Sequence, residues 1–243
     1  MSTSADANPA PRPAAPEAQG GRRNRVGWPE ITAGTFVALV LYAVGILLFL
    51  RIPAESTGLG GLAQYAVSGL APLGGFAAAV LVRVRGLGPF GLRRVCAKWL
   101  AVAFGAGILM IVLNIASTTA IFLYSGAQDT QASYQAAAAG GPAFFAAALL
   151  LGGFLTPVGE EFFFRGVLAN ALSRYGQWVA VLVSSAVFAL AHGINYLLPV
   201  AFVAGVVAAV LLHRTRSVWP GVVVHVVNNS YSVIAPAVMA LMV

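Results

Sequence analysis

Long runs of apolar residues, separated by short polar segments, make up most of the chain after residue 30. Most of these runs are close to the ~20 residues that a helix needs to cross the hydrocarbon core of a bilayer. We predict seven membrane-spanning helices, at residues 32–50, 60–82, 99–124, 142–172, 178–196, 198–212 and 218–240. The fourth run is too long for one simple crossing and contains Pro157, so it is either one long kinked helix or two shorter pieces. The pattern therefore predicts an all-α polytopic membrane bundle of about seven to eight transmembrane helices.

The first 30 residues have a different composition, rich in Ala, Pro, Gly and polar residues. Such a segment buries too little apolar surface to fold by itself. We expect a disordered cytoplasmic tail at 1–30 and a transmembrane helical domain at 31–243.

Composition agrees with a membrane protein, because 59% of the residues are hydrophobic and only 9% are charged. An average soluble domain has about 25% charged residues. Five of the seven acidic residues lie in the tail, in loops or at the edges of spans, where we expect them to be solvated: Asp6, Glu17, Glu30, Glu55 and Asp129. Only Glu160 and Glu161 lie inside a predicted span.

The basic residues indicate an orientation. If seven spans alternate, twelve Lys and Arg residues fall on one side and only Arg51 on the other, with Arg165 inside a span. Cytoplasmic loops carry the excess of basic residues, so we expect a cytoplasmic N-terminus. This bias also accounts for the net charge of +7, and we expect the lipid bilayer as partner, not nucleic acid.

A few polar groups lie inside the predicted spans, where they are costly and commonly mark a functional site. They include Glu160, Glu161, Arg165, His192, His225 and Asn229. Glu161 and Arg165 are four residues apart, as are His225 and Asn229, so each pair shares one helix face. At about 1.5 Å per residue, Glu160, His192 and Asn229 all lie roughly 20 Å from the cytoplasmic boundary. We therefore expect three helices to bring these groups together in one buried site.

Two chemistries fit this set of groups. Glu160, His192 and His225 could bind one divalent metal, for which the donor type favours zinc, and the metal would activate water. Alternatively, Glu160 and His192 could activate water without a metal, while His225 and Asn229 donate hydrogen bonds to the oxyanion. Both schemes hydrolyse an amide within the membrane, and the sequence leaves the choice open.

Other protease types lack their signatures. An aspartyl type needs two intramembrane aspartates, but Asp6 and Asp129 lie in a tail and a loop. No H-E-x-x-H string is present. Ser184 and Ser185 lie in a span, but there is no G-x-S-x-G string around them. Cys96 is the single cysteine, which excludes an intramolecular disulfide.

Three strings occur in the order E-E-x-x-x-R, F-x-x-x-H and H-x-x-x-N. They run from Glu160 to Arg165, from Phe188 to His192 and from His225 to Asn229. This arrangement resembles the signature of the CPBP family, also called the Abi or CAAX prenyl endopeptidase type II family. The part of the domain that bears these motifs is residues 141–235.

The resemblance implies an intramembrane endopeptidase with a cavity open to the cytoplasm. By analogy Glu160 would activate water with His192, and His225 and Asn229 would stabilise the oxyanion or hold a metal. Glu161, Arg165 and Phe188 would be supporting residues. The expected substrate is a membrane-associated protein or peptide, which is prenylated in eukaryotic relatives. We expect a multi-pass protein of a bacterial cell membrane.

Two other functions remain open. A non-enzymatic adaptor or bacteriocin-immunity-type protein could keep the protease fold for binding. A small transporter could use Glu160 and the histidines as a proton relay. The chain shows no internal repeat of the kind on which many transporters are built, and this argues against a transporter.

Overall fold

The computed structural model describes residues 25–84, 86–126 and 128–242, and these residues are helical apart from short connections, with no strand among them. The longer helices are α2 (Trp28–Phe49), α3 (Thr57–Val82), α4 (Ala97–Ser125), α9 (Gln177–Ala191), α10 (Leu198–Thr215) and α11 (Trp219–Ala240). A further long helical stretch is built from α6 (Pro142–Ala148), η2 (Leu149–Leu155), α7 (Thr156–Glu160), η3 (Glu161–Ala169), α8 (Asn170–Leu172) and η4 (Ser173–Tyr175). Two short pieces complete the set, η1 (Gly88–Phe90) and α5 (Ala132–Ala139). The predicted all-α membrane bundle is confirmed.

Six helical stretches in the described part of the chain are long and apolar enough to cross a membrane. Together they make the chain an integral membrane protein. The predicted fifth span differs from the others, because α9 is apolar but ends at Ala191, several residues before the predicted end at 196. The residues between α9 and α10 form a loop, in which Tyr196 donates a hydrogen bond to Asp129 at 3.0 Å. Burial and the neighbouring Asp129 carboxylate raise the pKa of Tyr196 to about 12, so its hydroxyl remains a donor at neutral pH.

The predicted fourth span is one continuous helical stretch, Pro142–Tyr175. Two parts of it, η2 and η3, are π-helical, and they flank the single α-helical turn that carries Glu160. At their ends the Thr156 amide donates to the Leu151 carbonyl and the Asn170 amide to the Arg165 carbonyl, each five residues back. π-Helical turns are rare and occur frequently at functional sites.

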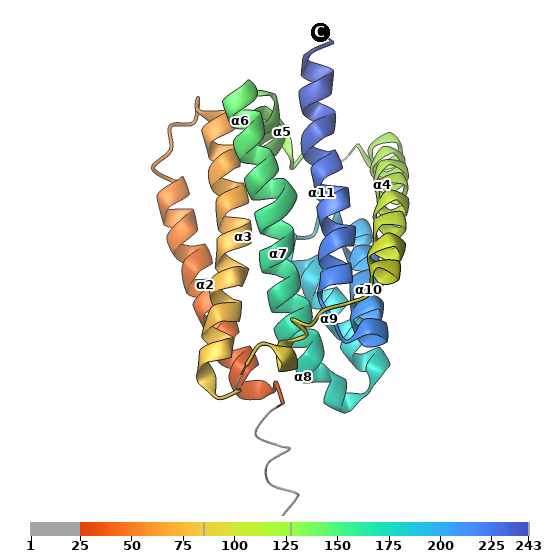
Figure 1. Cartoon of the computed structure of the whole chain (residues 1–243). Helices are drawn as coiled ribbons and strands as arrows, with labels where there is room; N and C mark the ends of the chain where they lie inside the picture. Colours follow the sequence, from red (N-terminus) through yellow and green to blue (C-terminus); the bar gives the residue numbers. More distant parts are fainter. Residues whose placement is uncertain (1–24, 85, 127, 243) are drawn as a thin grey trace, which may run out of the picture.

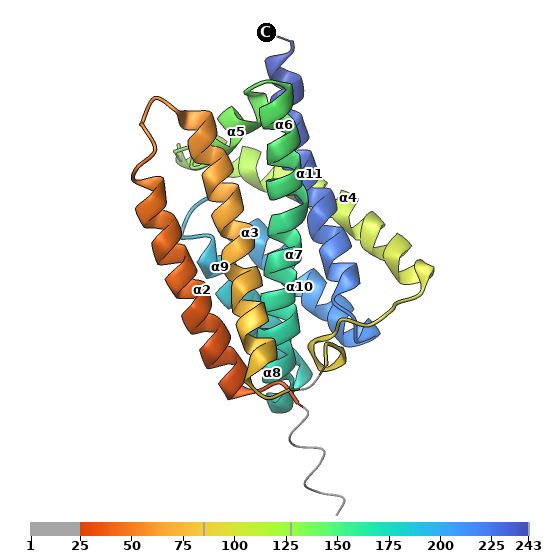
Figure 2. The same ribbon diagram turned by 60° about the vertical axis from the view of Figure 1, so that its left-hand side comes forward.

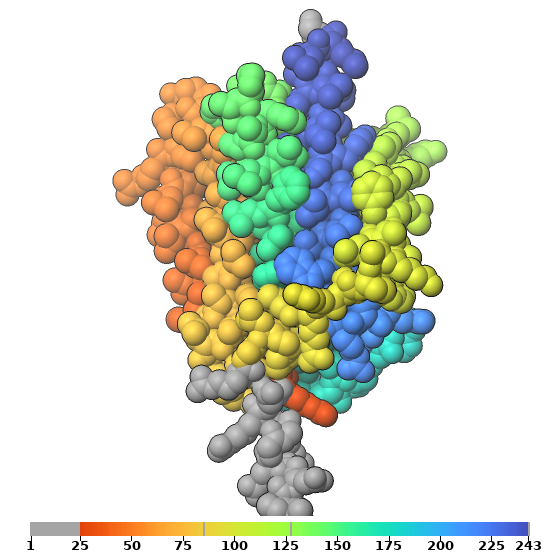
Figure 3. Space-filling view, viewed as in Figure 1, coloured from red at the N-terminus to blue at the C-terminus, as the bar shows by residue number. Residues whose placement is uncertain are grey.

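The helices alternate in direction, so that the bundle has two distinct ends (Figures 1 and 2). We call one the basic end, because the described basic residues other than Arg51 and Arg165 lie there, where α2 begins and α3 ends. The opposite, far end carries the α2–α3 loop, α5 and the C-terminal end of α11 (Figure 1). The segment between α3 and α4 runs across the surface at the basic end (Figure 3).

The expectation that Glu30 is solvated in the tail is wrong, because its side chain is fully buried. The helix α2 begins at Trp28, and Glu30 therefore lies in its first turn. Its carboxylate accepts hydrogen bonds from the Gly27 amide at 2.7 Å and from Arg83 Nη2 at 3.0 Å. This capping arrangement fixes the start of α2 to the end of α3. The remainder of the predicted tail, residues 1–24, lies outside the described residues.

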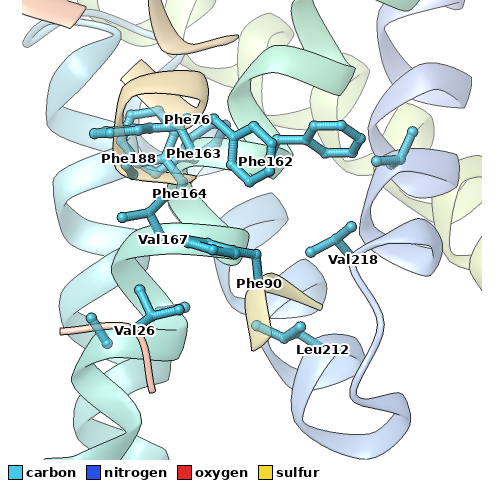
Figure 4. Packing of buried hydrophobic residues seen from close by; sticks show 14 of the residues in the cluster. Val26, Phe76, Phe90, Phe162, Phe163, Phe164, Val167, Phe188, Leu212 and Val218 are labelled. Carbon is cyan, nitrogen blue, oxygen red and sulfur yellow. The ribbon is translucent and has the colours of Figure 1, made fainter. Parts of the chain in front are cut away.

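A cluster of large apolar side chains fills the bundle between its middle and the basic end (Figure 4). Its most prominent members include Phe76, Phe90, Phe162, Phe163, Phe164, Val167, Leu212 and Val218. Phe76 contacts both Phe90 and Phe162, with ring centroids 5.5 and 5.1 Å apart. Tilted and edge-to-face ring pairs of this kind pack densely.

Candidate active site

Glu160 lies at the end of α7 and is buried, with 5% of its surface exposed. Its position depends on a close approach between α7 and α3. A Cβ on Gly159 would collide with the Gly69 carbonyl oxygen, and a Cβ on Gly69 would meet the Thr156 amide nitrogen at 3.0 Å. Small residues at such a crossing let two helix backbones approach closely within lipid. The pair of glycines therefore sets how far Glu160 stands from the rest of the bundle.

Glu161 forms the predicted pair with Arg165, with Glu161 Oε1 3.1 Å from Arg165 Nη1. Both side chains are only 1% exposed. The Arg165 guanidinium also lies 4.3 Å from the centre of the Phe188 ring, a cation–π contact. Phe188 packs edge-on against Phe164. Arg165 is thus enclosed between a carboxylate and an aromatic face, and the Glu161 charge is neutralised next to Glu160.

His225 brings the two carboxylates together from α11. Its Nδ1 lies 3.3 Å from Glu161 Oε1 and its Nε2 lies 3.6 Å from Glu160 Oε2. Gly221, one turn earlier on the same face of α11, leaves space for the Glu161 carboxylate, since a Cβ there would lie 2.5 Å from Glu161 Oε2. Both ring nitrogens of His225 therefore face carboxylate oxygens, and the missing side chain of Gly221 leaves room for Glu161 beside them.

His192 follows the last residue of α9, and its Nδ1 lies 2.9 Å from the Phe188 carbonyl oxygen. A carbonyl only accepts, so this contact requires the proton on Nδ1 and leaves Nε2 of the neutral ring as an acceptor. The imidazole also packs against the Phe188 ring, with centroids 4.7 Å apart. Phe188 thereby contacts His192, His225 and Arg165 together.

Asn229 stands one turn beyond His225, and its Nδ2 donates to the Gly152 carbonyl at 3.2 Å. The second hydrogen of this amide group remains available for another acceptor. Asn228 accepts a hydrogen bond from Asn114 of α4 at 3.4 Å. Three amide side chains thus extend the polar surface from Glu160 towards α4.

These residues line a cavity of about 690 Å³. The predicted site residues that line it are Glu160, Glu161, Phe188, His192, His225 and Asn229, whereas Arg165 lies behind Glu161 and outside the wall. The sequence analysis missed other polar wall residues, among them Tyr42, Asn114, Thr118 and Tyr134. Asn114 and Thr118 carried a usable signal, because they lie four residues apart within a predicted span and share one helix face.

The site does not have the form of the predicted metal centre. Among the residues that the structure describes, no three His, Cys, Asp or Glu side chains are grouped so that they could hold a metal ion. The predicted ligand His225 has its nitrogens directed at two carboxylates, and the Nδ1 of His192 is bonded to the backbone. Metal binding by Glu160, His192 and His225 is therefore not shown by this arrangement and stays a prediction.

Comparison with protein families identifies the part of the chain that carries this site. Residues 142–231 match the family model described as type II CAAX prenyl endopeptidase Rce1-like. Over this segment the chain is similar to the CPBP family. The Rce1-like segment contains all three predicted motifs, so the resemblance seen in the sequence is confirmed. Searches of curated proteins and of solved structures found no significant match.

The Rce1-like family is a protease family, which supports a peptidase in general terms. In this structure the Rce1-like segment runs from α6 into α11. Helices α2, α3 and α4 lie outside the match, yet α2, α3 and α4 all contribute to the cavity wall. The segment thus supplies the ionisable groups, and the preceding helices complete the chamber around them.

Proposed function

We propose that this chain is an intramembrane endopeptidase that hydrolyses a peptide bond of a membrane-associated protein or peptide. The observation that carries the proposal is the placement of Glu160 and His225 at the buried inner part of a cavity that His192 and Asn229 also line. The Rce1-like match over the same residues supports it.

Glu160 is the general base in this proposal. Glu161 is held by Arg165 at 3.1 Å and by His225 at 3.3 Å, so its oxygens are committed to structure. Glu160 has no arginine within ion-pair distance among the described residues and faces the cavity. A carboxylate in such a position can accept a proton from a water molecule, a contribution of typically 10²–10⁴-fold to rate.

His192 positions the water that Glu160 activates. With the proton on Nδ1, its Nε2 is an acceptor and can take a hydrogen bond from water in the cavity that His192 lines. His225 and Asn229 stabilise the negative charge that develops on the substrate, because their N–H groups can donate to the oxyanion that forms on its carbonyl.

The bonds made and broken balance as follows. The water oxygen forms a bond to the carbonyl carbon while Glu160 takes its proton. The carbon–nitrogen bond then breaks, and the proton held by Glu160 passes to the departing amine nitrogen. One water is consumed, a carboxyl group and an amine are formed, and Glu160 returns to its initial state.

We also propose that the N-terminus is cytoplasmic. All described basic residues except Arg51 and Arg165 lie at the basic end of the bundle, together with the start of α2. Cytoplasmic loops hold such an excess in most multi-pass proteins.

The proposal is tested by Glu160→Gln, which keeps size and removes the base. We expect peptide cleavage by the purified protein to fall by about 10²-fold or more. Membrane fractions from cells that carry the wild-type chain or Glu160→Gln, compared by proteomics, should show substrates that accumulate uncut only in the variant.

Glu55→Gln is the matched control, because Glu55 is an exposed glutamate in the α2–α3 loop. Its cleavage rate should equal that of the wild type. Wild-type cleavage by Glu160→Gln would refute the protease assignment and favour an adaptor that keeps the fold for binding.

Chelation provides a separate test of the metal-free scheme. Because the proposed steps use no metal, they predict that prolonged dialysis of the purified protein against a strong chelator changes the cleavage rate less than about twofold. Loss of activity that only zinc restores would show that the histidines rearrange to bind it.

A further inference from the structure

Most of the cavity lies in one half of the bundle, although Gly221 and Val224 of α11 extend its wall towards the basic end. On α2 its wall residues are Tyr42, Gly45, Ile46 and Phe49, and on α3 they are Ala63, Gln64, Tyr65, Val67 and Ser68. Because α2 starts at the basic end and α3 ends there, both sets lie in the half nearer the far end. Of the α10 wall residues, Val200, Ala201 and Ala204 also come from the half of that helix nearer the far end, and Ala208 lies just past its middle.

The other half of the bundle is filled. The aromatic cluster around Phe162 extends from the level of the site to the basic end (Figure 4). Phe162 contacts Phe76 and, edge-on, Trp219 with ring centroids 5.6 Å apart. Side chains packed at this density leave no passage for a peptide.

Exposure increases along the cavity wall towards the far end. Glu160 and His225 are buried, and Asn229 and Thr118 are half-buried. Gln135 of α5 and Ser232 of α11, which also line the cavity, are exposed. The wall therefore leads from the buried glutamates outwards to residues at the surface of the bundle.

The cavity wall carries acidic side chains without Lys or Arg to balance them. The residues that line the cavity include two glutamates and no Lys or Arg. Tyrosine, amide and hydroxyl groups make up most of its remaining polar surface, and they can hydrogen-bond a peptide backbone. A free carboxylate at the end of a substrate would find no Lys or Arg to pair with there, which favours an internal, uncharged segment.

The excess of basic residues assigns the basic end to the cytoplasm, so the far end lies on the other face of the membrane. We propose that the site takes its substrate from this non-cytoplasmic face. The substrate is an uncharged segment of a membrane-associated polypeptide exposed on that face. This inference rests on the proposed protease function, and it is the reverse of the cytoplasmic opening that the family resemblance implies.

Cysteine accessibility tests the direction of opening. The chain has one native cysteine, Cys96, which is exposed at the start of α4 near the basic end. In a Cys96→Ala background, Thr118→Cys places a thiol of similar size on the cavity wall. Thr119→Cys is the matched control, because Thr119 is the adjacent residue at almost the same depth, is exposed, and does not line the cavity. The probe is a small, membrane-impermeant methanethiosulfonate that carries a quaternary ammonium group.

In intact cells we expect Thr118→Cys to react at least 10-fold faster than Thr119→Cys, because only the water-filled cavity supports the reactive thiolate. Native Cys96 should react only after the membrane is permeabilised. Labelling of Cys96 in intact cells, or labelling of Thr118→Cys only after permeabilisation, would overturn the proposal.

Labelling does not require catalysis, so the two proposals fail separately. If Glu160→Gln cleaved normally while Thr118→Cys reacted from outside, the protease assignment would be lost and the direction of opening kept. The substrate part is tested by cleavage of a membrane-anchored reporter peptide displayed on either face. Cleavage of the reporter on the cytoplasmic face alone would overturn it.

Discussion

Two glutamates are buried beside an arginine in this molecule, one at the basic end of the bundle and one in its middle. At the basic end Glu30 receives Arg83, whose Nε lies 3.0 Å from Glu30 Oε1. In the middle Glu161 receives Arg165 at 3.1 Å. The nitrogen–oxygen distances of the two pairs are similar, but their surroundings differ.

The exposure of the arginine separates the two pairs. The Arg83 side chain is 36% exposed and remains partly hydrated, whereas that of Arg165 is 1% exposed. Arg165 Nε and Glu161 Oε2 lack hydrogen-bond partners among the described residues. Desolvation makes such a pair a poor source of stability. The Glu30–Arg83 pair, called the outer pair, joins α2 to α3. The Glu161–Arg165 pair, called the inner pair, instead positions Glu160 and His225.

The largest effect is expected from Arg165→Met, which leaves Glu161 buried without its arginine. Removal of one partner of a buried pair costs about 3–5 kcal/mol in the free energy of unfolding. Thermal unfolding of the detergent-purified protein measures the loss, and cleavage should disappear with it.

The double variant Glu161→Gln/Arg165→Met removes both charges and serves as its control. It should recover most of the lost stability and remain inactive, because the group that orients His225 is changed. Equal unfolding temperatures for the single and double variants would show that Glu161 is not held as a charge by Arg165.

A smaller effect is expected from Gly221→Ala, which changes no charge. The added methyl would lie 2.5 Å from Glu161 Oε2 and 3.2 Å from Ala208 Cβ. Overpacking of this kind costs about 1–3 kcal/mol, and displacement of Glu161 should lower the rate of peptide cleavage clearly.

Gly105→Ala is the matched control, since no atom lies within 4 Å of a Cβ at that position on α4. It should be neutral or slightly stabilising, as Ala is the better helix former. Identical cleavage rates for the two glycine variants would argue that the Glu161 position does not matter for catalysis.

The smallest effect is expected from Glu30→Gln in the outer pair. The amide oxygen of Gln can still accept from the Gly27 amide, and Arg83 stays partly hydrated. We expect a loss of about 1 kcal/mol, typical of one hydrogen bond, and a cleavage rate per folded molecule within twofold of wild type. A drop of 10-fold or more in that rate would mean that the outer pair also acts on the site.

The sequence was sufficient to predict the bundle and the identity of the polar groups at its centre. Apolar runs of membrane length depend on composition alone, and buried ionisable residues such as Glu161 and Arg165 stand out against them. Their four-residue spacing also predicted the ion pair between them, because that pair is local to one helix.

What sequence reasoning missed depends on contacts between helices. Glu30 was assigned to a solvated tail, since its burial requires Arg83 from another helix. The position of His225, with Nε2 3.6 Å from Glu160 Oε2, was likewise not predicted. Helical periodicity fixes the direction of a side chain on its own helix, but not which neighbouring helix meets it.

The π-helical turns beside Glu160 have a consequence for how this stretch can vary. A π-helical turn holds more residues than an α-helical turn, so it behaves as a one-residue insertion absorbed without a break in the helix. Deletion of one residue within η2 would therefore only restore the α-helical repeat. Deletion of one residue from α7 would instead swing everything on one side of it by about 100° relative to the other. Glu160 would then turn from the chamber to another face of its helix. The length of α7 is therefore a strict requirement for this site, whereas η2 next to it can lose one residue.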